Sequence, residues 1–329
     1  MPRDICYNEA TEYRKEDPLM NTAKMERFHD GARVCFVGDS LVARNQALPV
    51  VIEAYKERFP NEKIRFFNCG VSGGTAKHAH DSFEDDVLIC KPTHAVVAFG
   101  VNDSGRTRLS KERSAARYQD LKERYDRYRH YLTALCEKVT QNGIELILCT
   151  PAPFDEYTET SIPTLHGAYA LICEYANFVR SLAKEKGYRL VDYHAYLCEL
   201  MQTEPLFGDD HVHPTAHGFY RMAQFFLANQ GIEACEEHAE IPARFAAWRE
   251  KLFVYRSIAA AECMIINHYS LPQDEKNAIM REYLEKEKFG ARTGVGAYFE
   301  TIAKRYLEFK SQELDLAREV FEIYDRDLL

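Results

Sequence analysis

The chain has 329 residues, of which 46% are hydrophobic and 28% charged, enough for one large core and an appended segment. A net charge of -9 argues against a nucleic-acid partner, which would require a basic surface. The first 31 residues, a predicted N-terminal extension, contain no apolar run of signal-peptide length, and no later run is long enough to span a membrane. We therefore expect a cytoplasmic protein with no membrane partner.

Five short apolar runs, rich in Val, Ile, Phe and Leu, indicate strands that are buried on both faces of a sheet. They cover residues 33–37, 63–67, 94–99, 144–149 and 189–193. Helical stretches between or after them cover about 42–59, 75–88, 110–141, 164–186 and 215–230. This alternation predicts a three-layer α/β domain over residues 32–232, with a five-stranded parallel sheet. Ligands of such sheets bind at the carboxyl ends of the strands.

The ten cysteines are interpreted as reduced and mostly buried thiols.

The first predicted strand ends in Gly38-Asp39-Ser40, which places a serine where a strand gives way to a helix. Serine is a common helix N-cap, and the triplet alone favours that interpretation. The same position also suits a nucleophile, because it lies at the edge of the sheet where ligands bind.

Two further strand ends carry groups that could bind an oxyanion. The second strand leads into Asn68-Cys69-Gly70-Val71-Ser72-Gly73-Gly74, where the Gly70 amide could meet an anion, although the spacing of a phosphate-binding loop is missing. The third leads into Gly100-Val101-Asn102-Asp103, and the Asn102 side chain can donate to an oxyanion. Asn-Asp is also common in ordinary turns.

A candidate base lies far downstream, in Asp210-His211-Val212-His213-Pro214. An aspartate and a histidine three residues apart can meet within one turn, so Asp210 can hold His213 in the required tautomer. A neutral imidazole can take the proton of a serine hydroxyl and return it to a leaving alcohol. His213 is therefore the predicted general base.

These four motifs, in this order, resemble those of the SGNH, or GDSL-type, hydrolases, a family of esterases and lipases, over roughly residues 32–230. The resemblance implies a flavodoxin-like fold, with Ser40 as nucleophile, His213 as base and Asp210 as its orienting acid. It also implies an oxyanion hole formed by the Ser40 and Gly70 amides and the Asn102 side chain. We assign Asp39 and Asp103, the neighbours of Ser40 and Asn102, to substrate binding. His211 fills a position that is often glycine in relatives.

The predicted activity is that of a serine esterase working through an acyl-enzyme, with neither a cofactor nor a metal. The expected substrates are short-chain acyl esters, such as acetyl esters of small molecules or carbohydrates, and this expectation depends mainly on family analogy. Phe154 and Tyr157, in the loop after the fourth strand, either wall the substrate site or simply pack on the core.

Three other functions compete with this interpretation. A metal-dependent hydrolase could use the cluster at 209–217, which contains Asp209, Asp210, His211, His213 and His217, with Asp192 and His194 nearby. A cysteine nucleophile, Cys69 or Cys149, is a second alternative. A non-catalytic binding module on the same fold is the third.

Residues 233–329 show no strand pattern and are predicted to form a C-terminal helical segment. An apolar seam follows a three-four spacing through Phe299, Ile302, Tyr306, Phe309, Leu316, Val320 and Ile323. Packing of this seam against the main domain is the favoured interpretation. The alternative is a homo-oligomer formed through the C-terminal helices.

Overall fold

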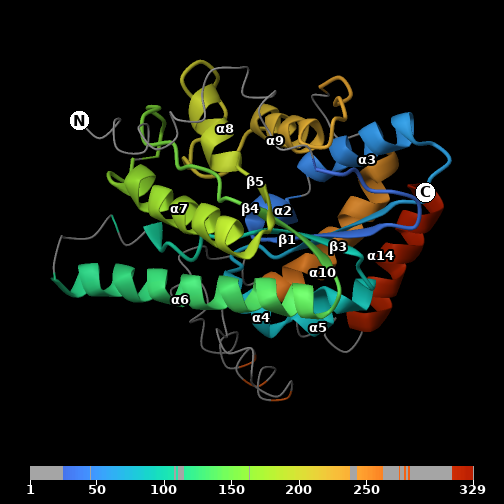
Figure 1. Ribbon diagram of the computed structural model, residues 1–329, viewed down its shortest axis with the longest axis horizontal. Coiled ribbons are helices and arrows are strands. Elements are labelled where there is room, and N and C mark those ends of the chain that lie inside the picture. The colour runs from blue at the N-terminus through green and yellow to red at the C-terminus, as the bar shows by residue number, and fades with distance from the viewer. Residues whose placement is uncertain are drawn as a thin grey trace.

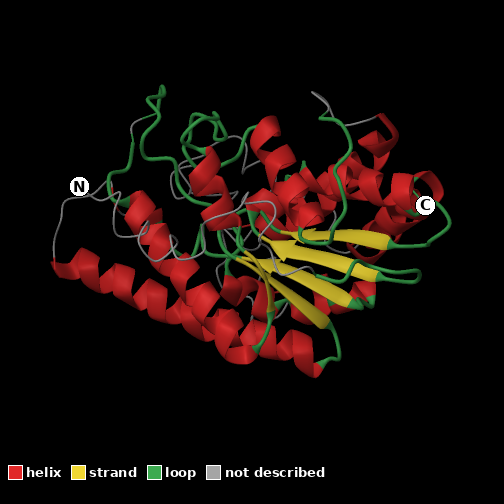
Figure 2. Cartoon of the chain, turned by 45° about the horizontal axis from the view of Figure 1, so that its top comes forward, coloured by secondary structure: helices red, strands yellow, loops and turns green. Residues whose placement is uncertain are grey.

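The computed structural model describes residues 25–44, 46–106, 109, 115–162, 164–237, 243–261 and 313–328, with single helical positions at 274, 278 and 281. Five parallel strands form one sheet in the order β2-β1-β3-β4-β5 (Figures 1 and 2). They are β1 (Arg33–Gly38), β2 (Arg65–Gly70), β3 (His94–Ala98), β4 (Glu145–Cys149) and β5 (Arg189–Val191). The predicted α/β fold with a five-stranded parallel sheet is confirmed.

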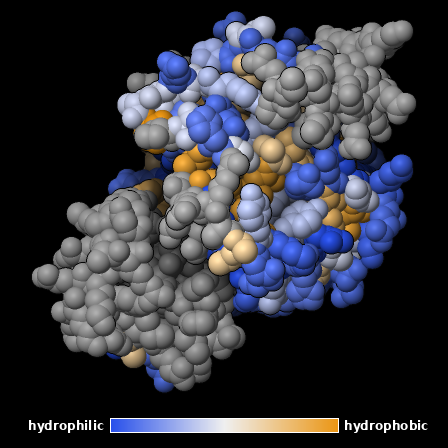
Figure 3. Space-filling model, turned by 90° about the vertical axis from the view of Figure 1, so that its left-hand side faces the viewer, coloured by the Kyte–Doolittle hydropathy of each residue, from blue (hydrophilic) through white to orange (hydrophobic). Residues whose placement is uncertain are grey.

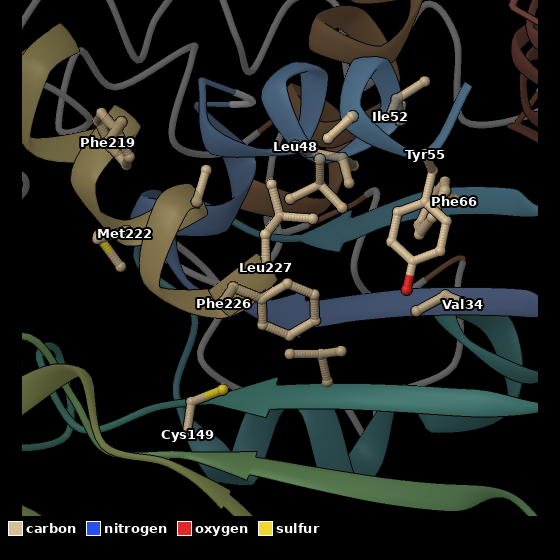
Figure 4. Packing of buried hydrophobic residues seen from close by; sticks show 14 of the residues in the cluster. Val34, Leu48, Ile52, Tyr55, Phe66, Cys149, Phe219, Met222, Phe226 and Leu227 are labelled. Atoms are coloured by element: carbon tan, nitrogen blue, oxygen red, sulfur yellow. The ribbon is translucent and has the colours of Figure 1, made fainter. Parts of the chain in front are cut away.

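Helices cover both faces of the sheet, as the alternating apolar side chains of the strands require. In β1, Val34 faces one core and Cys35 and Val37 face the other. The first core packs under α3 (Ala47–Arg58), α8 (Tyr193–Leu200) and α9 (Ala216–Ala228), as Figure 4 shows for α3 and α9. The second lies under α4 (Ala76–Asp81), α5 (Phe83–Asp86), α6 (Ala115–Gln141) and α7 (Ala168–Lys186). The short α2 (Ser40–Ala43) follows β1 directly.

The second strand extends beyond its predicted end. Asn68, Cys69 and Gly70 continue β2 and pair in register with Phe36, Val37 and Gly38 of β1. The polar Asn68 is tolerated inside the sheet because its side chain donates to the Val42 carbonyl at 2.8 Å and accepts from the Gly70 amide at 2.9 Å. The loop at this edge therefore begins after Gly70 rather than at Asn68.

Two C-terminal helices, α10 (Ala246–Ala261) and α14 (Glu313–Asp327), pack beside the edge strand β2 (Figure 1). The amide of Phe66 in β2 donates to the Tyr324 hydroxyl at 2.9 Å, and the rings of Phe67 and Phe321 meet at 5.3 Å. A backbone donor of the sheet edge is thus paired by a helix side chain instead of by another strand.

The C-terminal seam divides into a described and an undescribed part. Its members Leu316, Val320 and Ile323 are buried in the first core. The other four members, Phe299, Ile302, Tyr306 and Phe309, lie outside the described residues. The favoured interpretation, packing on the main domain, therefore holds for the described part, and a homo-oligomer stays a prediction.

The eight cysteines in the described part are all free, and six of them are buried, as expected.

Candidate active site

Ser40 and His213 are 173 positions apart in the chain, yet their side chains meet at the carboxyl edge of the sheet. The Ser40 Oγ lies 2.7 Å from the Nε2 of His213. The N-cap of α2 is not Ser40 but Asp39, whose carboxylate accepts from the Leu41 amide at 3.0 Å. Because Asp39 caps the helix, the Ser40 hydroxyl is left for the imidazole, and the capping role favoured for Ser40 from the triplet alone is wrong.

Asp210 holds His213 from the opposite side. Its Oδ2 pairs with the His213 Nδ1, and its Oδ1 accepts from the backbone amides of Val212 at 3.0 Å and His213 at 2.9 Å. Partial burial disfavours the charged form of Asp210, but these hydrogen bonds outweigh it and hold the pKa of its carboxyl well below the usual range. A carboxylate on Nδ1 fixes the tautomer in which Nε2 can accept the Ser40 proton.

Two of the expected oxyanion donors, Asn102 and Gly70, already make hydrogen bonds within the protein. The Asn102 Nδ2 donates to the Gly74 carbonyl at 3.0 Å, and an amide nitrogen carries a second hydrogen for another acceptor. The Gly70 amide donates to Asn68 Oδ1 at 2.9 Å, and the expected contact of this amide with an oxyanion stays a prediction. A Cβ at Gly70 would lie 2.4 Å from the Ala43 nitrogen, so this glycine allows close approach of α2 to β2.

Asp39 and Asp103, which were expected to bind substrate, are both buried, and their role in substrate binding stays a prediction. Their exposed fractions are 3% and 6%. Asp39 caps α2, and Asp103 accepts from the Ala76 amide at 3.1 Å, at the start of α4. Burial raises the pKa of Asp39 to about 6 and that of Asp103 to about 7. Both carboxyl groups therefore accept hydrogen bonds from backbone amides at the starts of helices α2 and α4.

The burial of Asp103 predicts a pH-dependent stability difference. Because its pKa rises from 3.8 to about 7 on folding, ionising Asp103 costs more in the folded than in the unfolded protein. The free energy of unfolding of Asp103→Asn, relative to that of the wild type, should therefore increase as the pH rises from about 4 to about 7. Urea denaturation across this range measures the difference, with exposed Asp85→Asn as control. A difference that does not change with pH would contradict the prediction.

Apart from the pair of Asp210 with His213, the residues of the alternative metal site, at 209–217, bind separate partners. Asp209 accepts from the Ser161 hydroxyl, and His217 lies between Glu204 and Glu237. His211 is buried and contacts the Ile162 carbonyl through Nε2 at 2.8 Å. Its φ of 63° explains why glycine suits this position in relatives. In the described part of the chain, these side chains do not bring three ligand atoms together.

The remaining candidates of the sequence analysis lie away from the Ser40 hydroxyl or in the core. Asp192 binds Arg180 at 2.7 Å, and His194 is buried beside Cys173. Cys149 is buried, which raises the pKa of its thiol well above the usual value and disfavours a nucleophilic thiolate. Phe154 belongs to the second core, whereas Tyr157 is 46% exposed and meets Tyr169 at a ring distance of 5.6 Å.

A small apolar cavity lies beside Ser40 and was not foreseen from the sequence. Its volume is about 60 Å³, and both chain neighbours of Ser40, Asp39 and Leu41, line it. Val101 and Met222 contribute from two other elements. Figure 3 shows the side toward which the strand arrows of Figure 2 point, and hydrophobic residues gather there between hydrophilic ones. No motif predicts such a cavity, because its walls come from segments far apart in the chain.

Comparison with known proteins identifies the family. A model of the GDSL-like lipase/acylhydrolase family matches residues 36–221, more than half of the chain. An acetylxylan esterase of Geobacillus stearothermophilus is 25% identical over 226 residues, which cover 62% of this chain and 95% of that protein. An uncharacterized lipoprotein of Bacillus subtilis, YqeF, is 26% identical over 146 residues, 39% of this chain and 54% of that protein. The chain belongs to the GDSL-like lipase/acylhydrolase family, and it is a carboxylic ester hydrolase.

Solved structures show the same fold. A gut microbial diltiazem-metabolizing enzyme superposes with a TM-score of 0.67 at 17% sequence identity. The superposition covers 92% of this chain and 97% of the chain of that enzyme. A catalytic mutant of Axe2, an acetylxylan esterase from Geobacillus stearothermophilus, gives a TM-score of 0.53 at 22% identity, with coverage of 63% and 98%. The first match therefore extends well beyond the α/β domain, and the second does not.

Proposed function

We propose that the protein is a serine esterase that hydrolyses short-chain acyl esters, above all acetyl esters, of small molecules or carbohydrates. The observation that carries the proposal is the 2.7 Å contact of the Ser40 Oγ with the Nε2 of His213, whose Nδ1 binds Asp210. A hydroxyl, a base and an orienting carboxylate in this order make up the machinery of acyl transfer.

The proposed reaction has two halves. His213 Nε2 takes the Ser40 proton as Oγ attacks the ester carbonyl carbon, and Asp210 stabilises the resulting imidazolium. The Ser40 amide and the Asn102 side chain donate to the oxyanion of the tetrahedral intermediate. The imidazolium then returns the proton to the departing alcohol, leaving an acyl-enzyme on Ser40. Water, deprotonated by His213, releases the carboxylic acid by the same steps, and no cofactor is required.

The preference for short acyl groups is supported by the cavity beside Ser40. Measured as the space open to the centre of a water, one water needs about 10–15 Å³, so a volume of about 60 Å³ suits an acyl group of a few heavy atoms. The name of the Geobacillus stearothermophilus relative, an acetylxylan esterase, points to an acetyl ester of a carbohydrate as one candidate substrate.

A series of p-nitrophenyl esters with acetyl, butyryl and decanoyl groups tests the acyl preference, because the leaving group stays the same. We expect kcat/KM to fall steadily with chain length. Fastest hydrolysis of the decanoyl ester would contradict the short-chain assignment. Acetylated xylooligosaccharides, compared with acetylated small alcohols under the same conditions, then identify the alcohol class.

Asn102→Ala is expected to lower kcat on the order of a hundredfold or more. A single oxyanion donor typically contributes about 2–4 kcal/mol to the transition state and much less to substrate binding, so KM should change little. Steady-state kinetics on p-nitrophenyl acetate measure both constants. Asn142→Ala is the control, because Asn142 is exposed just after α6 and its side chain donates to the Lys138 carbonyl of that helix. An unchanged kcat in Asn102→Ala would remove Asn102 from the oxyanion hole.

Two properties of the whole protein remain predictions. None of the described helices is both long and apolar enough to cross a membrane, and one relative carries the name of a lipoprotein. Cell fractionation of the native host tests the cytoplasmic location. Light scattering tests the homo-oligomer through the C-terminal helices.

A further inference from the structure

Three buried thiols gather beneath the edge of the sheet, away from the residues used in the proposed mechanism. Cys35 lies in β1, Cys69 in β2, and Cys90 ends the short 3-10 helix η2 (Leu88–Cys90). Their sulfur atoms all lie within 4.8 Å of one another, and each residue is at most 2% exposed. The sulfur atoms of this cluster thus come from two neighbouring strands and from the helical turn before β3.

A buried cation lies against this group. Arg256 of α10 is 5% exposed and lines a small void, of about 10 Å³, together with Cys90. Its Nη1 lies 3.4 Å from Asp86 Oδ1, a long contact for a hydrogen bond. Its Nε is buried and has no hydrogen-bond partner in the described part of the chain. The guanidinium thus faces Asp86 at one nitrogen and keeps a buried donor unused at another, which indicates that a further acceptor belongs nearby.

The thiols themselves can supply that acceptor. When the three thiols bind a metal ion they lose their protons, and the resulting thiolates carry negative charge. Thiolates are the protein ligands that soft and borderline d¹⁰ metal ions prefer.

We propose that Cys35, Cys69 and Cys90 form a structural binding site for one thiophilic d¹⁰ metal ion, Zn²⁺ or Cu⁺. With Zn–S bonds of about 2.3 Å, tetrahedral geometry separates the sulfurs by about 3.8 Å, which the observed cluster allows. Three thiolates and Zn²⁺ carry one net negative charge; Arg256 faces Asp86 through Nη1, and its unused Nε is the donor that remains for the cluster. Zinc would take a fourth ligand, such as water, whereas Cu⁺ is satisfied by three thiolates. The bound ion replaces the thiol protons, which are released to solvent.

The site is separate from the proposed reaction. Cys35 precedes Ser40 by five residues, and the three steps from Cys35 to Gly38 along β1 already span about 10 Å at 3.3 Å per residue. The ion would therefore join β1, β2 and η2 without touching the ester. Stabilisation by metal and hydrolysis of ester can be measured independently on the same protein.

The test uses the full chain, reduced and stripped with a chelator, titrated with Co²⁺ as a spectroscopic substitute for Zn²⁺. We expect about one ion per chain, a thiolate-to-cobalt charge-transfer band, and loss of that band when Zn²⁺ or Cu⁺ is added. Whichever of the two displaces cobalt at the lower free concentration identifies the ion. The melting temperature should rise with the bound metal.

Variants locate the ligands. Cys90→Ser should abolish the band, whereas Cys136→Ser, a buried cysteine of α6 outside the cluster, should keep it. Arg256→Met should weaken metal binding roughly 10- to 100-fold, as changes around a metal's ligands usually do. Wild-type protein that hydrolyses esters yet binds none of the three ions would overturn the proposal. Equal binding by Cys90→Ser and wild type would also overturn it, and circular dichroism shows whether each variant folds.

Discussion

Ser40→Ala is expected to reduce kcat for p-nitrophenyl acetate by at least about a thousandfold. The methyl group cannot attack the carbonyl or form an acyl-enzyme, so only the oxyanion donors and substrate binding remain to assist water. Binding contacts stay intact, so KM should change far less than kcat. The measurement is steady-state hydrolysis, together with mass spectrometry for an acyl adduct on the wild-type chain.

The matched control is Ser161→Ala. Ser161 is an exposed serine whose hydroxyl binds Asp209 at 3.1 Å, so its loss should leave kcat within about twofold, because such surface changes cost little. Undiminished hydrolysis by Ser40→Ala would rule out the serine mechanism. Activity that depends instead on a chelatable metal would favour a metal-dependent hydrolase.

The second large effect is expected for Asp210→Asn, with a fall in kcat of about ten thousandfold. An asparagine can still accept from the Val212 and His213 amides, which bind Oδ1 at 3.0 and 2.9 Å. Its amide nitrogen, however, faces the His213 Nδ1 and favours the tautomer whose Nε2 carries a proton. His213 then cannot accept the Ser40 proton, and the imidazolium loses its counter-charge.

The neighbouring Asp209→Asn is the control, because Asp209 lies one residue away and contacts Ser161 instead of the imidazole. A drop of less than tenfold in Asp210→Asn, with native circular dichroism, would mean that Asp210 does not orient the base. Because the carboxyl pKa of Asp210 lies far below neutral, activity between pH 5 and pH 9 should not report its titration.

The sheet could be predicted from the sequence because strands buried on both faces must be continuously apolar. The same criterion misplaced the end of β2. Asn68 looks like a loop residue by composition, and only the folded structure supplies the Val42 carbonyl and Gly70 amide that satisfy its side chain inside the sheet. The error moved Gly70 from the strand into the loop.

The pairing of Asp210 with His213 could be predicted because a three-residue spacing closes one turn, whereas Ser40 was joined to them through the resemblance to the SGNH hydrolases. Which side chain caps α2 could not be decided, since aspartate and serine are about equally good N-caps. The choice depends on backbone angles and side-chain direction at Asp39. The burial of Asp103 depends likewise on α4, which packs over it from a distant part of the chain.

The pairing of β2 with α14 has a consequence for the order of synthesis. The ribosome completes β2 at Gly70, but the Tyr324 hydroxyl that pairs with the Phe66 amide is made only 258 residues after Phe66. Until then the nascent sheet carries an open edge, the kind of surface that recruits other strands. Premature termination before Glu313 should therefore yield chains that aggregate, even though every residue of the ester-hydrolysing site has already been made.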